Sequence, residues 1–396
     1  MNGWRDTTIG GLGRVVTGST PPSKHPDWFG DDLPFVTPSD ITFGNRRPRP
    51  ERWLSQSGRD GLRTRVVPPG SAAFVCIGAT IGKVCLVETE AITNQQINTV
   101  IPGPHTDSRF LYSLLRHLAP TVTQGASGAT TPIINKSAFS AIPVRIPDLE
   151  TQVRIGEVLG ALDDLIENNR RRVEVLEEMA RAIYREWFVK FRYPGYEDVP
   201  LVGSALGPIP EEWTVRRLDE LATFVGGSTR TKAAYVDAGY VAFSAAGPDG
   251  FVPDYEVDGP GVVLSAVGAK CGRTFWASGK WSSIANTIKI LPKEPELFAN
   301  WLRFATDDSS VWPKRGSAQP FVSINDARGV LSRVATRETH LRFEDAVKPM
   351  VDQAVVLEAG ARGLAALRDL LLPKLVTGQI DVTSLDLDAA IAEQVA

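Results

Sequence analysis

Cysteine, histidine and long apolar runs are all scarce in this sequence of 396 residues. The three cysteines are odd in number and form no CxxC pair, which predicts a reducing compartment: Cys76, Cys85 and Cys271. No apolar run reaches the roughly eighteen residues of a membrane-spanning helix, and no basic-then-apolar signal opens the chain. We therefore expect a cytoplasmic protein without a membrane partner.

Motifs of enzyme chemistry are missing as well. The four histidines are scattered, without HExxH and without a cysteine at metal-ligand spacing, and neither GxSxG nor GxGxxG occurs. Residues 78–83 resemble a phosphate loop, but only three residues separate the glycines and Val84 stands where a hydroxyl is needed. A tight glycine turn between two strands is the better interpretation. We expect a binding protein with no catalytic residue and with neither a metal nor a cofactor of its own.

Charge is unevenly distributed along the chain. The net charge of −3 argues weakly against nucleic acid. Residues 1–149 nevertheless carry 15 basic and 11 acidic side chains, residues 211–340 carry 15 of each, and 381–396 hold four acidic residues and no basic one. Seven arginines lie between positions 46 and 65, a run that is either a solvated loop or a phosphate-binding surface.

Two long helical segments dominate the sequence. Apolar residues alternate at spacings of four and three, the pattern of a coiled-coil seam, at Ile155, Leu159, Leu162, Ile166, Asn169, Val173, Leu176, Ala180, Ile183 and Trp187. The same seam recurs 188 residues later, apolar at nine of ten positions, with Arg368 as the exception. We expect the two helices to pack on each other, with Asn169 setting their register. Pro349 predicts a late start or a kink in the second helix, and Pro373 an end before Leu375.

The repeat extends over the whole chain. Gly18 matches Gly227, Gly78 matches Gly268, and Ile133 matches Phe321. Because the offset falls from 209 to 190 between the first two pairs, the first copy holds about 19 extra residues there, in the span of the arginine run. Each copy is expected to open with a short helix near Trp4 or Trp213. The predicted domains are 1–147 and 211–340, the helices 148–192 and 341–380, with a linker at 193–210 and an acidic tail at 381–396.

Two similar modules on spacer helices suit a bipartite target such as duplex DNA, whose half-sites lie about 34 Å apart per helical turn. Basic and amide side chains in loops can contact phosphates and base edges. The candidate DNA-binding residues of the first copy are Arg46, Arg47, Arg49, Arg52, Arg63, Arg65, Lys83, Gln95, Gln96, Asn98 and Lys136. Those of the second copy are Arg230, Lys232, Lys270, Arg273, Lys314, Arg315 and Gln319.

A set of short motifs resembles the specificity subunits of type I restriction–modification systems. They are Thr-Gly-Ser-Thr-Pro at 17–21, Pro-Phe-Val-Thr-Pro-Ser-Asp-Ile at 34–41, Ile-Pro-Val-Arg-Ile-Pro at 142–147, Pro-Ile-Pro-Glu-Glu-Trp at 208–213 and Leu-Arg-Asp-Leu-Leu-Leu-Pro-Lys-Leu at 367–375. The second copy departs from the pattern at 241–244, which lacks Thr-Pro-Ser-Asp, and at Pro349.

The resemblance implies an α+β fold: two target-recognition domains, each reading half of a split, asymmetric DNA sequence, separated by two antiparallel coiled-coil helices. The implied partners are double-stranded DNA, two modification subunits that use S-adenosylmethionine to methylate adenine, and restriction subunits that use ATP and magnesium. Two alternatives stay open from the residues alone. One is a protein-binding scaffold; the other is a standalone adenine methyltransferase, which would need a cofactor loop and an Asn-Pro-Pro-aromatic motif that the sequence lacks.

Overall fold

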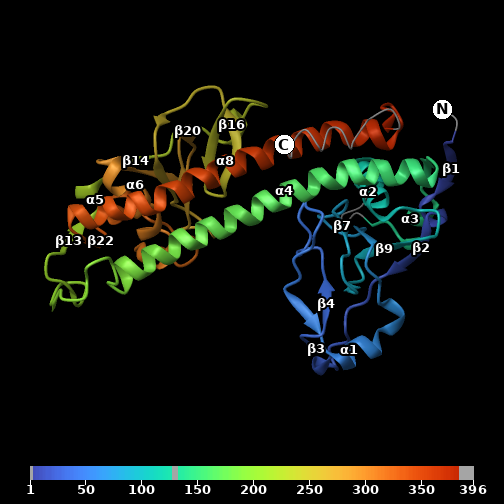
Figure 1. Cartoon of the computed structure of the whole chain (residues 1–396), viewed down its shortest axis with the longest axis horizontal. Coiled ribbons are helices and arrows are strands. Elements are labelled where there is room, and N and C mark those ends of the chain that lie inside the picture. Colours follow the sequence, from blue (N-terminus) through green and yellow to red (C-terminus); the bar gives the residue numbers. More distant parts are fainter. Residues whose placement is uncertain (1–2, 127–132, 383–396) are drawn as a thin grey trace. The chain divides into compact units, whose positions relative to one another are not determined.

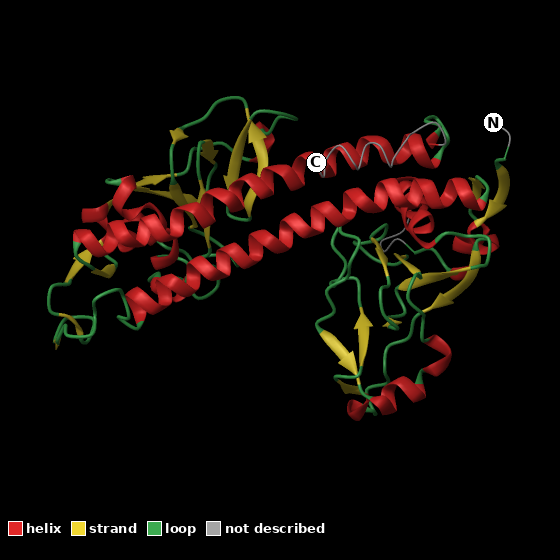
Figure 2. Cartoon of the chain, viewed as in Figure 1, coloured by secondary structure: helices red, strands yellow, loops and turns green. Residues whose placement is uncertain are grey.

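The chain folds into two compact units that combine helices and sheets (Figures 1 and 2). The computed structural model describes residues 3–126 and 133–382. Unit 1 comprises the described residues of 1–171 and 357–396, and unit 2 comprises residues 172–356. Helices α4 (Leu149–Tyr184) and α8 (Arg337–Val376) each contribute residues to both units. The predicted α+β class is confirmed. Among the described residues, no helix is long and apolar enough to cross a membrane.

Each unit is built around a central antiparallel sheet of four strands, and the two sheets share one topology. In unit 1 the order is β2-β9-β6-β7, with strands Gly13–Thr17, Ile97–Pro102, Ala72–Val75 and Val84–Leu86. In unit 2 it is β14-β21-β18-β19, with strands Ala222–Gly226, Thr287–Pro292, Gly261–Ser265 and Thr274–Ala277. The predicted repeat is therefore present in the strand order as well as in the sequence.

A second sheet of four strands accompanies each central sheet. Unit 1 has the order β3-β5-β4-β8, with strands Phe29–Gly30, Arg52–Leu54, Leu33–Val36 and Ile92–Thr93. Unit 2 has β16-β15-β20-β17, with strands Gly247–Val252, Tyr240–Ser244, Lys280–Ser283 and Val257–Asp258. The pairs β4–β8 and β15–β20 are parallel, whereas the other pairs in these sheets are antiparallel. The order β5-β4-β8 of unit 1 therefore corresponds to β16-β15-β20 of unit 2, whereas the fourth strand is added at opposite edges, β3 next to β5 and β17 next to β20.

The helices expected near Trp4 and Trp213 are strands instead. Strand β1 (Arg5–Thr8) pairs with β10 (Pro143–Ile146), and β13 (Thr214–Arg217) pairs with β22 (Leu331–Val334). Only a single turn of helix follows each strand, at Ile9–Gly11 and at α5 (Leu218–Leu221). The pairing with a strand more than a hundred residues away outweighs the local helical spacing, a contact that the local sequence does not reveal.

The long helices pack antiparallel within each unit, as the seams predict. Helix α4 begins after Asp148, whose Oδ1 accepts a hydrogen bond from the amide of Thr151. In unit 1, Ile155 and Leu159 share one buried core with Leu372 and Leu375, so the start of α4 meets the end of α8. In unit 2, the end of α4 and the π-helical turn after it (Arg185–Val189) meet the start of α8. All ten predicted seam positions of each helix are buried or half-buried.

Helix α8 neither starts late at Pro349 nor ends at Pro373, contrary to those two sequence predictions, and the alternative of a kink at Pro349 stays a prediction. The helix starts twelve residues before Pro349 and continues past Pro373 to Val376. Pro349 lies on the exposed face, as does Asp345 four residues earlier, so the carbonyl left without its usual N–H donor is on the solvent side. Val347 and Val351 are buried in the core of unit 2, and that packing holds the helix across the proline.

Shorter helices cover the central sheets. In unit 1, α2 (Ser108–Ala126) packs on β6 and β7, and in unit 2, α6 (Pro295–Ala305) packs on β18 and β21. Two short helices, α3 (Lys136–Ala141) and α7 (Ile324–Arg328), lead into β10 and β22 respectively. Helix α1 (Gln56–Gly61) belongs to the insertion-bearing span of the first copy, and the predicted linker contains the hairpin β11–β12 (Leu201–Val202 and Ile209–Pro210).

Candidate nucleic-acid interface

Several loops meet at one end of the central sheet of unit 1. These are residues 18–22 after β2, 76–83 between β6 and β7, and 94–96 before β9, together with the segment 133–136; we call this set the loop end of unit 1. Backbone hydrogen bonds join the loops, from Ser19 to Thr93 (2.8 Å), from Cys76 to Gln96 (2.8 Å) and from Ile134 to Cys76 (2.9 Å). The loop end holds four of the predicted residues: Lys83, Gln95, Gln96 and Lys136.

The loop between β6 and β7 is the tight glycine turn predicted from the sequence. Gly78 and Gly82 have φ values of 92° and 89°, in the left-handed region that favours glycine. Their counterparts Gly268 and Gly272 adopt 94° and 89°. The two copies therefore present the same backbone turn at the same end of the sheet.

Side chains at the loop end of unit 1 are held by local polar contacts. The Lys83 ammonium donates to the carbonyl of Pro38 (2.9 Å) and lies 5.8 Å from the ring centre of Phe43. The hydroxyl of Thr20 donates to the Gln95 side chain, and Asn94 donates to that of Gln96. Gln95 and Lys136 are exposed. The exposed members are thus the residues of this copy best placed to meet a ligand.

Asn98, another predicted contact, lies inside the sheet. Its side chain is buried, where it accepts a hydrogen bond from Thr17 (2.7 Å) and donates to the sulfur of Cys76 (3.2 Å). The Asn98 side chain therefore links β2 to the start of the loop after β6, and so holds the loop end in place.

The loop end of unit 2 has the same construction. Residues 227–231, 266–273, 284–286 and 315–321 form it, joined by backbone bonds from Ser228 to Ser283 (3.0 Å), from Ala266 to Asn286 (2.9 Å) and from Val322 to Ala266 (2.8 Å). It contains five predicted residues, Arg230, Lys270, Arg273, Arg315 and Gln319, with Lys232 and Lys314 next to it in sequence. The structure brings most candidates of the second copy to one end of the sheet.

Carboxylates that the sequence analysis did not consider hold several of these cations. Arg230 makes two hydrogen bonds to Asp254, of 2.6 and 2.8 Å, and these hold the pKa of the Asp254 carboxyl below its usual range. Lys232 pairs with Asp249, and Arg315 pairs with Asp326. The side chains of Lys270 and Arg273 are exposed and make no hydrogen bond or ion pair among the described residues. Lys314 donates to the hydroxyl of Ser309 (3.4 Å).

One of these carboxylates explains the departure of the second copy from the family motif. In unit 1, Asp40 accepts hydrogen bonds from the amide and the hydroxyl of Thr37, at 2.7 and 2.8 Å. In unit 2, Asp249 accepts from the hydroxyl of Ser244 at 2.8 Å. In both units a carboxylate thus accepts a hydrogen bond from the hydroxyl residue at the end of the strand, but in unit 2 this carboxylate comes from a later position in the sequence.

The arginine run does not form one surface. Arg47 pairs with Glu88 (2.7 Å), Arg52 lies over the rings of Phe29 and Phe35, and Arg65 donates to the carbonyl of Thr17 (3.0 Å). Arg49 and Arg63 are exposed. Arg65 thus contacts the strand that leads into the loop end, at Thr17.

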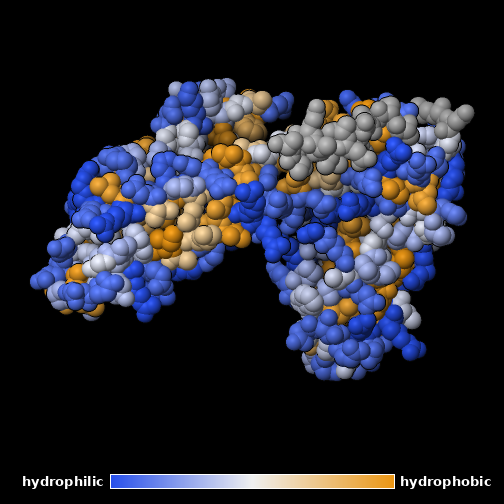
Figure 3. All heavy atoms as spheres, in the orientation of Figure 1, coloured by the Kyte–Doolittle hydropathy of each residue, from blue (hydrophilic) through white to orange (hydrophobic). Residues whose placement is uncertain are grey.

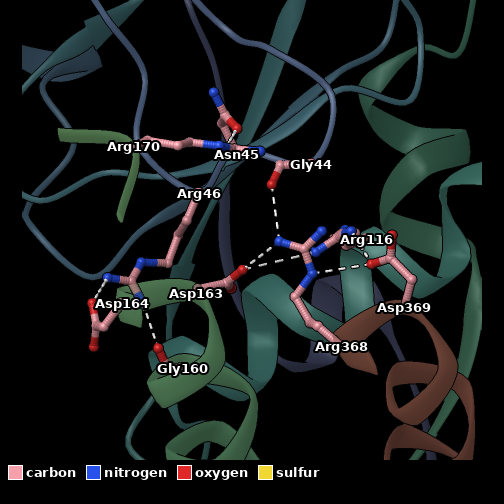
Figure 4. A network of polar contacts seen from close by, with 10 residues as sticks. All are labelled: Gly44, Asn45, Arg46, Arg116, Gly160, Asp163, Asp164, Arg170, Arg368 and Asp369. Carbon is pink, nitrogen blue, oxygen red and sulfur yellow. Dashed lines mark hydrogen bonds and ion pairs between the residues drawn. The ribbon is translucent and has the colours of Figure 1, made fainter. Parts of the chain in front are cut away.

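Arg46 turns away from solvent into a network at the long helices (Figure 4). It is 8% exposed, pairs with Asp164 of α4 and donates to the carbonyl of Gly160 (3.3 Å). The guanidinium is occupied by protein groups, so we assign it to the packing of the first-copy loop on α4.

The centre of the same network is a buried ion pair between α4 and α8. Arg368, the one polar position of the α8 seam, lies 2.6 Å from Asp163 of α4 and donates to the carbonyl of Gly44 (3.0 Å) (Figure 4). Arg116 of α2 also pairs with Asp369. Sequence periodicity identified Arg368 as an exception but not its partner Asp163, which stands outside the seam.

Across residues 3–126 and 133–382, no group of three or more histidine, cysteine, aspartate or glutamate side chains could hold a metal ion.

Comparisons with known proteins place the chain. Residues 1–178 match the family "Type I restriction modification DNA specificity domain". The chain is similar to the type I restriction enzyme MjaIX specificity subunit of Methanocaldococcus jannaschii, with 24% identity over 96% of this chain and 94% of the relative. It is also 32% identical to the HindI specificity subunit of Haemophilus influenzae, over 37% of this chain and 33% of that one.

A solved structure has the same fold. The type I restriction–modification S subunit from M. genitalium superposes with a TM-score of 0.60 at 15% identity, covering 95% of this chain and 96% of that one. The family match, the full-length relative and this shared fold agree with one another. Residues 1–178 carry the type I restriction modification DNA specificity domain, and the chain as a whole is similar in sequence to type I specificity subunits and shares the fold of one.

Proposed function

We propose that this subunit reads a bipartite, asymmetric sequence in double-stranded DNA, with each loop end reading one part. One observation carries the proposal: two loop ends share one backbone design and present different polar side chains. Unit 1 offers Lys83, Gln95 and Gln96, whereas unit 2 offers Lys270 and Arg273. Two loop ends with the same backbone conformation and different side chains suit two different half-sites.

The residue types match the chemistry of base and phosphate contacts. Glutamine can bond an adenine edge with two hydrogen bonds, and arginine can do the same with guanine. Exposed lysines suit phosphates, which position a protein on the duplex. We expect the exposed candidates to contact DNA, and Arg46 and Asn98 to act through the fold that carries them.

The long helices are proposed to dock the modification subunits. Both expose large apolar side chains: Val175 and Met179 of α4 in unit 2, and Leu367 and Leu370 of α8 in unit 1. Figure 3 shows apolar atoms among hydrophilic ones along the stretch where these helices run. Two partner subunits would supply S-adenosylmethionine-dependent adenine methylation, and restriction subunits would supply ATP- and magnesium-dependent cleavage. The assembly is expected to act in the cytoplasm, where cellular DNA is accessible.

A domain exchange tests the division of labour. The chain is produced with its modification subunits in a host free of adenine methylation, and the methylated adenines are sequenced. Replacing residues 1–147 by those of another specificity subunit should change one half of the target and leave the other intact. Loss of all methylation together with loss of DNA binding, in a complex that still assembles, would contradict independent readers. The reciprocal exchange of 211–340 is the matched control.

A further inference from the structure

Each loop end displays one large apolar side chain in the midst of polar loops. Ile133 in unit 1 is 57% exposed, and Phe321 in unit 2 is 40% exposed. A single exposed apolar side chain is common on protein surfaces, but here one stands at the corresponding place in both loop ends. Neither residue is among the candidate DNA-binding residues named from the sequence.

The two residues occupy the same place in the two copies. Ile133 forms an antiparallel bridge with Ile77, and Phe321 forms one with Val267, in each case just before the glycine turn. The next residue donates the matching backbone bond in both copies, from Ile134 to Cys76 and from Val322 to Ala266. The equivalence therefore rests on backbone geometry as well as on the offset of 188 in the sequence.

The backbone holds Phe321 firmly in this position. A second bridge pairs it with Arg315, through hydrogen bonds of 2.8 Å in both directions. Gly268 also donates to the carbonyl of Pro320 (2.9 Å). Because this backbone is already paired on both sides, it loses little further conformational freedom when the side chain is covered.

The surroundings are those of a nucleic-acid surface. Arg315, Gln319 and Lys270 are exposed in the same loops as Phe321, and Lys136 follows Ile133 by three residues. Cations of this kind bind phosphates, and an apolar group between them reaches toward the bases. In DNA complexes, apolar side chains contact thymine methyl groups or insert between base steps.

We propose that Ile133 and Phe321 each make an apolar contact with the bases of the half-site that their unit reads, and so contribute to sequence choice. The inference rests on the proposed DNA-reading function and adds two specificity residues to it. The contact concerns the bases and not the phosphates, so it should be independent of salt.

The test uses the full chain with its modification subunits and a fluorescent duplex carrying the target found by methylation sequencing. Two further duplexes have one half-site scrambled. Wild type should discriminate against both. Phe321→Ala should lose about tenfold of the discrimination at one half-site only, since one base pair is worth about that factor or more. Ile133→Ala should lose it at the other. The slope of affinity against salt should not change in either variant.

Matched variants separate a contact from a folding defect. Leu331→Ala removes a comparably exposed apolar side chain, 43% exposed, from β22 of unit 2, outside the loop end, and should bind as wild type does. Phe321→Leu should retain most of the discrimination. Thymine-to-uracil changes in the affected half-site identify a methyl contact, and 2-aminopurine fluorescence identifies insertion between bases.

Two failures are distinguishable. If wild type shows no preference for the target over scrambled duplexes, the DNA-reading function itself fails. If wild type discriminates and Phe321→Ala and Ile133→Ala discriminate equally well, only the apolar contact is overturned.

Discussion

Removing one partner of the buried ion pair between Arg368 and Asp163 should destabilise unit 1 far more than removing one partner of a surface pair does. Both side chains are almost fully buried, at 3% and 5% exposure, and their charged atoms lie 2.6 Å apart. Burial alone would lower the pKa of Arg368, but its hydrogen bonds to Asp163 and Asp369 outweigh burial and raise that pKa. The guanidinium therefore stays charged, and removing either partner leaves a buried charge without its counterion.

We expect Arg368→Ala to lower the free energy of unfolding by about 3–5 kcal/mol, the range for breaking one side of a buried pair. Arg116, 4.0 Å from Asp163, compensates in part and favours the lower end of that range. The double variant Arg368→Leu with Asp163→Leu should recover most of the loss, because apolar packing can replace a buried pair. Arg342→Ala is the matched control on the same helix, since its exposed pair with Glu338 is worth about 0.3–0.5 kcal/mol.

Hydrogen exchange measured peptide by peptide is the suitable assay, because it reports the two units separately. Protection should fall in α2 and in residues 44–46 of unit 1, and should be retained in α6 of unit 2. Added salt should change the result little, since a buried pair is weakly screened. If Arg368→Ala costs no more than Arg342→Ala, or if the two leucine substitutions are additive, the ion pair does not have the assigned role.

Three further predictions concern pH, salt and helix length. Burial lowers the pKa of His340 to about 3, so below pH 6.5 the unfolded chain binds a proton that the folded chain does not. The free energy of unfolding of unit 2 should therefore fall by up to about 1.4 kcal/mol per pH unit between pH 6.5 and 3. In acid-unfolding curves, His340→Leu should not show this pH dependence. Lys270→Ala and Arg273→Ala should each weaken binding to every duplex and flatten the salt dependence by about one unit, whereas an unchanged slope would remove them from the phosphate contacts. One heptad inserted between residues 171 and 172 and one between 356 and 357 lengthen each helix by about 10 Å. The gap between the two halves of the methylated target should then widen by about three base pairs, at about 3.4 Å each. Full methylation at the original spacing would show that the helices do not set the length of this gap.

Periodic and local features could be predicted from the sequence, because they depend on neighbouring residues. The seam of α4 and α8 follows from the spacing of its apolar side chains, and the turn at Gly78–Gly82 follows from the position of its glycines. The repeat was detectable because glycines and apolar residues recur at similar offsets along the chain, and the strand order of the two central sheets confirms it.

Features that depend on distant contacts could not be predicted in this way. The partner of Arg368 requires the register of two helices that lie 205 residues apart in sequence. The burial of Arg46 requires the first-copy loop to fold against α4, and the pairing of Arg230 with Asp254 requires the path of a loop. Pro349 was misread because a helix rule was applied without knowledge of which face is exposed and which face is packed.

The core of unit 1 is completed by residues that the ribosome makes after the whole of unit 2. Leu372, Leu375 and Val376 complete its core, and Gly378 lies against the ring of Trp4. At about 5–20 residues per second, residues 172–356 take roughly 10 to 40 s to synthesise. During that time the core around Ile155 and Leu159 lacks the residues of α8, although the residues of α2 have already been made. The nascent subunit is therefore expected to depend on chaperones for unit 1, and unit 2, a single continuous segment, is expected to finish folding first.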